Sequence, residues 1–210
     1  MLTDYIMASQ IIAMSLFSLT MSITPGPVNM INLSSGVTHG YKKTIPFVSG
    51  ATVGFILLLV VLGMGFMQVI GAYPVFLKYM SMGGAGFIFY IGYKIAMSKP
   101  DIYAQRVNCP TFMEGFLLQL LNPKAWLACM SGISLFADEK SYYPLILFVS
   151  LYLVICFMSL SSWAILGDKL KVFIKSKTRL KFFNYVVGIL LSACAVYLLY
   201  SSHTDPFGIK

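Results

Sequence analysis

Two short interruptions of apolar sequence decide the predicted fold: Thr24-Pro25-Gly26-Pro27 and Asn122-Pro123-Lys124. Proline within a helix removes an amide donor and clashes with the preceding turn, so each motif breaks a helix. Threonine and asparagine also cap helix N-termini, and proline suits the first helical position. Each motif therefore predicts that a half-helix starts inside an apolar segment, with Thr24 and Asn122 as the capping residues.

Six apolar stretches accompany these interruptions, each about long enough to cross a bilayer as a helix. They are Tyr5–Ile23, Thr44–Val69, Val75–Met97, Phe112–Phe136, Tyr142–Leu166 and Phe182–Tyr200. Of the 210 residues, 58% are hydrophobic and only 10% are charged, whereas a soluble domain carries roughly 25% charged residues. We therefore predict an all-α membrane protein with six transmembrane helices, as one integral membrane domain over residues 1–210.

The chain divides into two similar halves. Pro25 and Pro123 lie 98 positions apart, and so do the starts of the second and fifth stretches, Thr44 and Tyr142. Repeat 1 covers about residues 1–98, repeat 2 about residues 112–202, and residues 99–111 connect them. Three spans per half place the second half upside down. We predict two inverted three-helix repeats with the first and fourth helices broken at mid-membrane, a pattern typical of secondary transporters.

The basic residues predict the orientation in the membrane. Eleven lysines and arginines lie in the first, third and fifth loops, against three on the opposite side. By the positive-inside rule, the basic loops are cytoplasmic and both termini lie outside. Basic loops beside the inner leaflet, including the run from Lys169 to Lys181, thus explain the net charge of +8. No nucleic-acid partner is expected.

A substrate site is predicted where the two interruptions meet. Half-helices that begin at mid-membrane direct amide groups and positive dipole ends at one place, which suits a carboxylate. Lys124 lies near the middle of its span and is expected to contact that carboxylate. Asn29, Asn32 and the carbonyls ahead of each break are candidates to hold an ammonium group. The candidate substrate-binding residues are Thr24, Pro25, Gly26, Pro27, Asn29, Asn32, Gln119, Asn122, Pro123 and Lys124.

The same residues have structural interpretations, which stay open at this point. The prolines could merely kink packed helices, and Lys124 could be satisfied by carbonyls freed at the other break. Asn29, Asn32 and Gln119 could join helices through hydrogen bonds. The Gly50–Gly54 spacing is typical of close helix packing rather than of a binding site.

Three segments resemble the signature of the LysE/RhtB family of amino-acid exporters: residues 24–40, residues 92–96 and residues 115–125. The serines and histidine of the first segment are most similar to the cysteine/O-acetylserine exporter branch. The resemblance implies efflux of amino acids or close derivatives across the bacterial inner membrane, by alternating access and driven by a coupling ion such as the proton. A second copy of the chain is also a candidate partner. Many members have asparagine after the Pro-Gly-Pro motif, where this chain has Val28.

Other classes of protein fit less well. A transmembrane thiol-relay protein of the CcdA/DsbD type needs a redox cysteine in each broken helix. Cys129 follows Pro123, but the first span has no cysteine, so the cysteines are interpreted as small core residues. An enzyme, a cofactor and a metal site are not expected, because both histidines lie at span ends and no ligands cluster. A non-transporting membrane scaffold is the remaining alternative.

Overall fold

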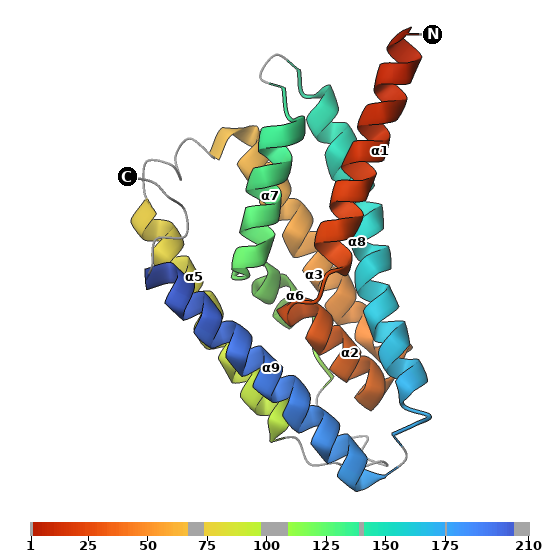
Figure 1. Ribbon diagram of the computed structural model, residues 1–210, viewed down its shortest axis with the longest axis vertical. Helices are drawn as coiled ribbons and strands as arrows, with labels where there is room; N and C mark the ends of the chain where they lie inside the picture. The colour runs from red at the N-terminus through yellow and green to blue at the C-terminus, as the bar shows by residue number, and fades with distance from the viewer. Residues whose placement is uncertain (1, 67–73, 98–108, 139–140, 175, 204–210) are drawn as a thin grey trace.

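The computed structural model describes residues 2–66, 74–97, 109–138, 141–174 and 176–203, and in those residues the fold is all-helical (Figure 1). The helices are α1 (Leu2–Ile23), α2 (Pro27–His39), α3 (Tyr41–Val61), a π-helical segment η1 (Leu62–Phe66), α5 (Pro74–Ala96), α6 (Phe112–Leu120), α7 (Pro123–Phe136), α8 (Tyr143–Leu170) and α9 (Lys177–His203). The predicted all-α class is therefore confirmed for the described part of the chain.

Length and apolar character support up to four membrane spans among the described residues. Three helices qualify alone, over Tyr41–Gly65, Tyr143–Leu170 and Lys177–Val196. The pair Ala8–Ile23 and Pro27–His39 qualifies together as one broken span, bent by 62°. Helix α5 and the α6–α7 pair coincide with the other two predicted spans but are not among these candidates. The six-span inverted repeat therefore stays a prediction.

The first interruption differs from its prediction in where the new helix begins. Helix α2 starts at Pro27, and its N-terminal flanking residue is Gly26, in extended conformation and without a side-chain cap. The prediction that Thr24 caps this helix is wrong, because the helix starts at the second proline, two residues beyond Pro25. The second interruption agrees with its prediction: α7 starts at Pro123, and the side chain of Asn122 accepts from the backbone N–H of Lys124.

Small residues set the distances between the central helices. A side chain added at Gly50 of α3 would collide with the carbonyl of Phe112 at the start of α6, and one at Gly115 of α6 would collide with the carbonyl of Phe47. A Cβ atom at Gly54 would also lie close to the carbonyl of Phe116, at 2.8 Å. The Gly50–Gly54 spacing therefore does what its structural interpretation predicted: it lets α3 and α6 pack backbone to backbone.

Helices α5 and α9 lie side by side, with most of their contacts to each other (Figure 1). Gly92 and Gly188 allow this pair to approach closely. The remaining helices form the other part of the bundle, in which α8 packs along α1, α2 and α3. Its core holds fully buried side chains from both halves of the chain, among them Phe47, Phe148 and Tyr152.

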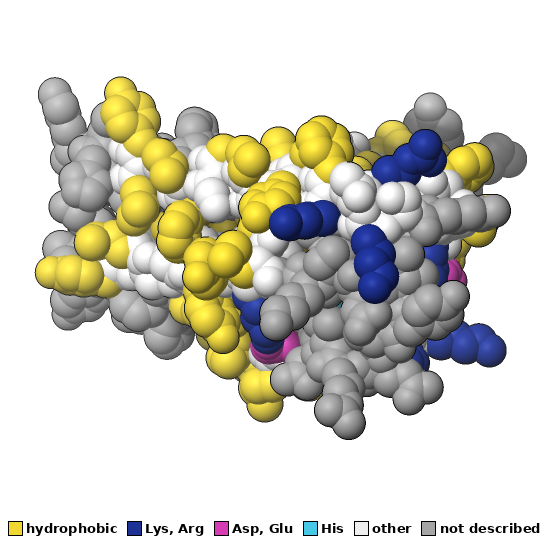
Figure 2. Space-filling model, turned by 90° about the horizontal axis from the view of Figure 1, so that it is seen from below, with side chains coloured by type: hydrophobic (Ala, Val, Ile, Leu, Met, Phe, Trp, Pro, Cys, Tyr) yellow, Lys and Arg dark blue, Asp and Glu magenta, His cyan; other side chains and the backbone are white. Residues whose placement is uncertain are grey.

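Basic side chains gather at one end of the bundle, the end that Figure 2 views. Helices α2 and α8 end there and α3 and α9 begin there (Figure 1). The described basic residues next to these helix ends are Lys42, Lys43, Lys169, Lys171, Lys177 and Arg179. Other basic residues used in the orientation argument lie outside the described residues, namely Lys99, Arg106, Lys140, Lys175 and Lys210.

Candidate functional site

The two interruptions contact each other. The ammonium group of Lys124, one residue into α7, donates to the backbone carbonyl of Thr24 at 2.8 Å and to the Thr24 hydroxyl at 2.8 Å. Gly26 makes room for this contact, because a Cβ atom there would lie 3.3 Å from Cδ and 3.4 Å from Nζ of Lys124. In this conformation Lys124 is therefore satisfied by a carbonyl of the other break, as its structural interpretation proposed.

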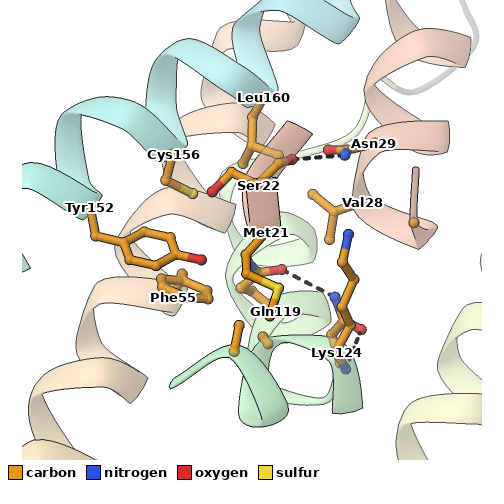
Figure 3. Close-up of a pocket in the computed structure, with 14 residues that line it drawn as sticks. Met21, Ser22, Val28, Asn29, Phe55, Gln119, Lys124, Tyr152, Cys156 and Leu160 are labelled. Carbon is orange, nitrogen blue, oxygen red and sulfur yellow. Dashed lines mark hydrogen bonds between the residues drawn. The ribbon is translucent and has the colours of Figure 1, made fainter. Parts of the chain in front are cut away.

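A pocket lies beside this contact and encloses about 380 Å³ of empty space, including its open mouth. Figure 3 shows residues from both interruptions and from α3 and α8 facing it. Its walls are Met21, Ser22, Gly26, Val28, Asn29, Phe55, Gln119, Asn122, Lys124, Ala125, Ala128, Tyr152, Cys156 and Leu160. The pocket is thus shared by the two halves of the chain.

Five of the predicted site residues line this pocket: Gly26, Asn29, Gln119, Asn122 and Lys124. The other five are placed around it rather than in its wall.

Among those five, Thr24 holds Lys124, and Pro27 and Pro123 are the first residues of α2 and α7. Pro25 is exposed at the first interruption. Asn32 is fully buried on α2, and neither polar atom of its side chain has a hydrogen-bond partner.

The backbone carbonyls freed at the first interruption are already occupied by side chains. Asn29 Nδ2 donates to the carbonyls of Ser22 and Thr24 at 2.9 and 2.8 Å. Trp163 Nε1 on α8 donates to the carbonyl of Ile23 at 3.0 Å. The carbonyls ahead of this break were expected to hold a ligand, but in this conformation they are already paired, which avoids the cost of an unpaired polar group in apolar surroundings.

The second interruption is satisfied in a similar way. Trp126 Nε1 donates to the carbonyl of Leu120 at 2.7 Å. The side chain of Asn122 accepts from the backbone N–H of Lys124 at 3.2 Å, and its carbonyl accepts from the N–H of Ala125 at 2.8 Å. The first turn of α7 is therefore capped from within. Sequence reasoning did not find Trp126 and Trp163, which were marked only by the rarity of tryptophan in the chain.

The two half-helices differ in what they offer to an anion. The α7 N-terminus is capped by Asn122, whereas α2 has no side-chain cap and no acidic residue in its first turn. The amides of Val28 and Asn29 belong to the first turn of α2, whose N–H groups have no intrahelical acceptor. The α7 end therefore has one of its first-turn amides satisfied by its own cap, whereas the α2 end has none satisfied by a side-chain cap.

Lys124 adds positive charge to this same helix end. A cation beside a helix N-terminus is unfavourable, because both repel positive charge and attract an anion. In the described part of the chain, Lys124 makes no ion pair with a carboxylate, and no acidic residue lines the pocket. Two positive features thus converge on one pocket without a negative partner.

Residues of α3 and α8 that sequence reasoning missed complete the pocket. Tyr152 stacks on Phe55, with ring centroids 4.3 Å apart, and its hydroxyl points into the pocket (Figure 3). Cys156 lies one helical turn further along α8 and also faces the pocket. The only sequence signal was their i, i+4 spacing, which places them on one helix face. All four cysteines of the chain are free thiols.

An aromatic cluster closes the bundle between this pocket and the first turns of α8. Phe148 of α8 contacts Phe136 of α7 at 5.1 Å and Phe17 of α1 at 6.0 Å between ring centroids. It also meets Tyr152 edge to face at 5.5 Å. The cluster lies away from the end that carries the basic side chains.

The comparisons with known proteins place the chain among translocators rather than enzymes. A family model described as LysE type translocator matches residues 19–202, so the chain belongs to this family. The resemblance read from the two interrupted motifs is thereby confirmed.

Named relatives of the chain also indicate a transporter. The chain is 30% identical over 188 residues to a cysteine/O-acetylserine efflux protein of Escherichia coli O157:H7, with 88% of this chain and 94% of the relative covered. It is 29% identical, with the same coverage, to proteins of that name from Escherichia coli K12 and Shigella flexneri serotype 5b. No solved structure matches the chain.

Proposed function

We propose that this protein is a secondary transporter that exports an amino acid or close derivative, of the cysteine/O-acetylserine type, across the bacterial inner membrane. The family match and the efflux proteins among its relatives support this proposal. The working architecture is the predicted one: six spans as two inverted repeats, with the basic loops in the cytoplasm and both termini outside. The pocket between the two interruptions is the central substrate site, and alternating access exposes it to either side.

The observation that carries the proposal is the unpaired positive charge at this pocket. An ammonium group has three donors, and Lys124 uses two of them on Thr24. The third donor, together with the first-turn amides of α2, suits one carboxylate. A bound carboxylate would supply the negative charge that the described residues around Lys124 lack, at a depth where an uncompensated cation is costly.

The ammonium group of the substrate needs hydrogen-bond acceptors elsewhere in the pocket. Asn29 Oδ1 is buried without a hydrogen-bond partner, and Asn29 lines the pocket. The hydroxyl of Tyr152 and the side chain of Gln119 face the same space. A zwitterion could thus keep a hydrogen-bonded partner for each charge while it crosses an apolar barrier, which is the physical requirement for a carrier.

Alternating access requires that the pocket be closed on one side at a time. The cluster of Phe17, Phe136 and Phe148 provides closure towards the predicted outer side. We propose the proton as coupling ion, and a second copy of the chain as a partner in the membrane. A proton gradient that leaves the export rate unchanged would remove the proton from this scheme.

The test of the central site is transport into inside-out vesicles that contain Lys124→Gln. We expect uptake of labelled cysteine or O-acetylserine to fall about tenfold or more, because a charge-assisted hydrogen bond contributes roughly 1.5–3 kcal/mol. The matched control is Lys42→Gln, which removes an exposed lysine far from the pocket. Equal transport by both variants would contradict the proposed role of Lys124, and no transport by the unmodified protein would contradict the proposed function itself.

A further inference from the structure

A second cavity lies between α2, α3, α5 and α6, and it encloses about 570 Å³ including its mouth. Its polar wall includes Ser34, Ser35 and His39 of α2, Lys94 of α5 and Glu114 of α6. The central pocket shares none of these residues. The cavity is therefore a separate feature that the central site does not explain.

Two opposite charges border this cavity. Lys94 Nζ and Glu114 Oε1 form an ion pair at 3.0 Å between α5 and α6, and their side chains are 44% and 29% exposed. Glu114 has a second anchor, because its other carboxylate oxygen accepts from the backbone N–H of Thr111 at 2.8 Å. Lys94 has no second hydrogen bond in the described part of the chain. Glu114 would thus stay in place if Lys94 moved away.

We propose that this cavity is a second substrate site, which binds the zwitterionic amino acid before it reaches the central pocket. This inference rests on the proposed function. The amino acid's carboxylate pairs with the ammonium of Lys94, and its ammonium pairs with the carboxylate of Glu114. Each charged side chain exchanges one partner for another, so no charge is left unpaired in the half-buried site. A ligand with only a carboxylate or only an ammonium group would pair with only one of these two side chains.

The wall of the cavity also has room for the rest of an amino acid. Ile31, Phe47 and Ile91 supply an apolar surface beside the charged pair. Such a mixture, a mostly apolar wall with few polar groups, is typical of small-molecule sites.

The position of the cavity fits a site that loads substrate. Helix α2 connects the two pockets: Asn29 lines the central one and His39 lines the second. Ile31 of the second cavity lies only two positions after Asn29, so the two linings follow each other along α2. The second cavity lies towards the end of the bundle where basic side chains gather (Figure 2), which is the predicted cytoplasmic end. An exported amino acid approaches from that side.

The test measures transport into inside-out vesicles as a function of amino-acid concentration, for Lys94→Gln, Glu114→Gln and the control Lys42→Gln. We expect the half-saturating concentration to rise about tenfold for the first two variants, the size expected for loss of a charged hydrogen bond, with the maximal rate nearly unchanged. Inhibition by acetate should weaken only in Lys94→Gln, and inhibition by ethylamine should weaken only in Glu114→Gln.

A purely structural role for the ion pair has a different signature. It would lower the maximal rate or the amount of folded protein in both variants, and it would leave the two inhibitors equally effective. That result would overturn the second site. So would half-saturating concentrations equal to those of the Lys42→Gln control. In either case, transport by the unmodified protein would still support the proposed function. Absence of transport by the unmodified protein would instead reject the proposed function.

Discussion

Lys124 and Thr24 lie 100 positions apart in the chain, yet the ammonium of Lys124 donates to both oxygens of Thr24 at 2.8 Å. This contact joins the two interrupted helices at the wall of the central pocket. It also engages two of the three donors of the ammonium group, which leaves only one for a substrate carboxylate. The contact is therefore both a structural link between the halves and a competitor of the proposed substrate.

Replacing Thr24 by valine tests that competition. Thr24→Val removes the hydroxyl and keeps the backbone carbonyl, so Lys124 gains a free donor. We expect the half-saturating substrate concentration to fall about threefold to tenfold, because a typical hydrogen bond contributes roughly 0.5–1.5 kcal/mol. Transport kinetics in inside-out vesicles measure it. Thr20→Val is the control, since the Thr20 hydroxyl bonds to its own helix at Leu16; a weaker apparent affinity in Thr24→Val would argue against competition.

Gly26→Ala probes the position of the lysine side chain. The added methyl would lie 3.3 Å from Cδ and 3.4 Å from Nζ of Lys124, while the extended backbone at Gly26 accepts alanine without strain. We expect transport to fall severalfold, with thermal stability changed by less than about 1 kcal/mol because the flexible lysine yields. Gly86→Ala is the matched control, as nothing lies within 4 Å of its added methyl. Unchanged transport would show that Lys124 can move without consequence.

Trp163→Phe tests how the first interruption is stabilised. Phenylalanine keeps much of the ring but loses the Nε1 donor, so the carbonyl of Ile23 is left without this partner. We expect the free energy of unfolding to fall by about 0.5–1.5 kcal/mol, the net contribution of a typical hydrogen bond, because this contact is exposed. Thermal unfolding in detergent measures it. A variant as stable as the unmodified protein would mean that another donor, such as water, reaches this carbonyl.

Cys109 provides a probe of orientation and of local burial. It lies just before α6, where its thiol donates to the carbonyl of Lys43 at 3.0 Å. Burial raises the pKa of the Cys109 thiol above its usual range. Because the folded state favours the protonated thiol, this contribution to stability is present at neutral pH and is lost as the pH rises through the raised pKa.

In a variant with the other three cysteines replaced by alanine, we expect a membrane-impermeant maleimide to label Cys109 from the cytoplasmic side only. The labelling rate at neutral pH should be below that of a free thiol, because the thiolate is the reactive form. The rate should rise with pH, and denaturant should remove the difference from a free thiol. Labelling from the opposite side would reverse the predicted topology.

Much of the local structure could be predicted from the residues alone. The start of α7 at Pro123, with Asn122 as its cap, follows from local chemistry and is confirmed. The close approach at Gly50 and Gly54 likewise follows from a local spacing. Thr24 was wrongly predicted as a cap because two prolines compete to set one helix start, and the structure selects the second.

The site was harder to predict than the helices. Gly26, Asn29, Gln119, Asn122 and Lys124 were found because polar or proline-flanked residues stand out in apolar sequence. Tyr152 and Cys156 were not, since a tyrosine or cysteine inside an apolar helix is equally typical of a core.

By itself, the sequence determined that the chain is helical and apolar and where its helices are interrupted, because these properties depend on residues close together in the chain. Only the tertiary structure decided which partners satisfy the interruptions: Lys124 reaches Thr24 across 100 positions, and Trp163 reaches Ile23 across 140. Such pairings depend on how the helices pack. A freed carbonyl accepts from whichever donor the packing brings to it, and no local pattern specifies that donor.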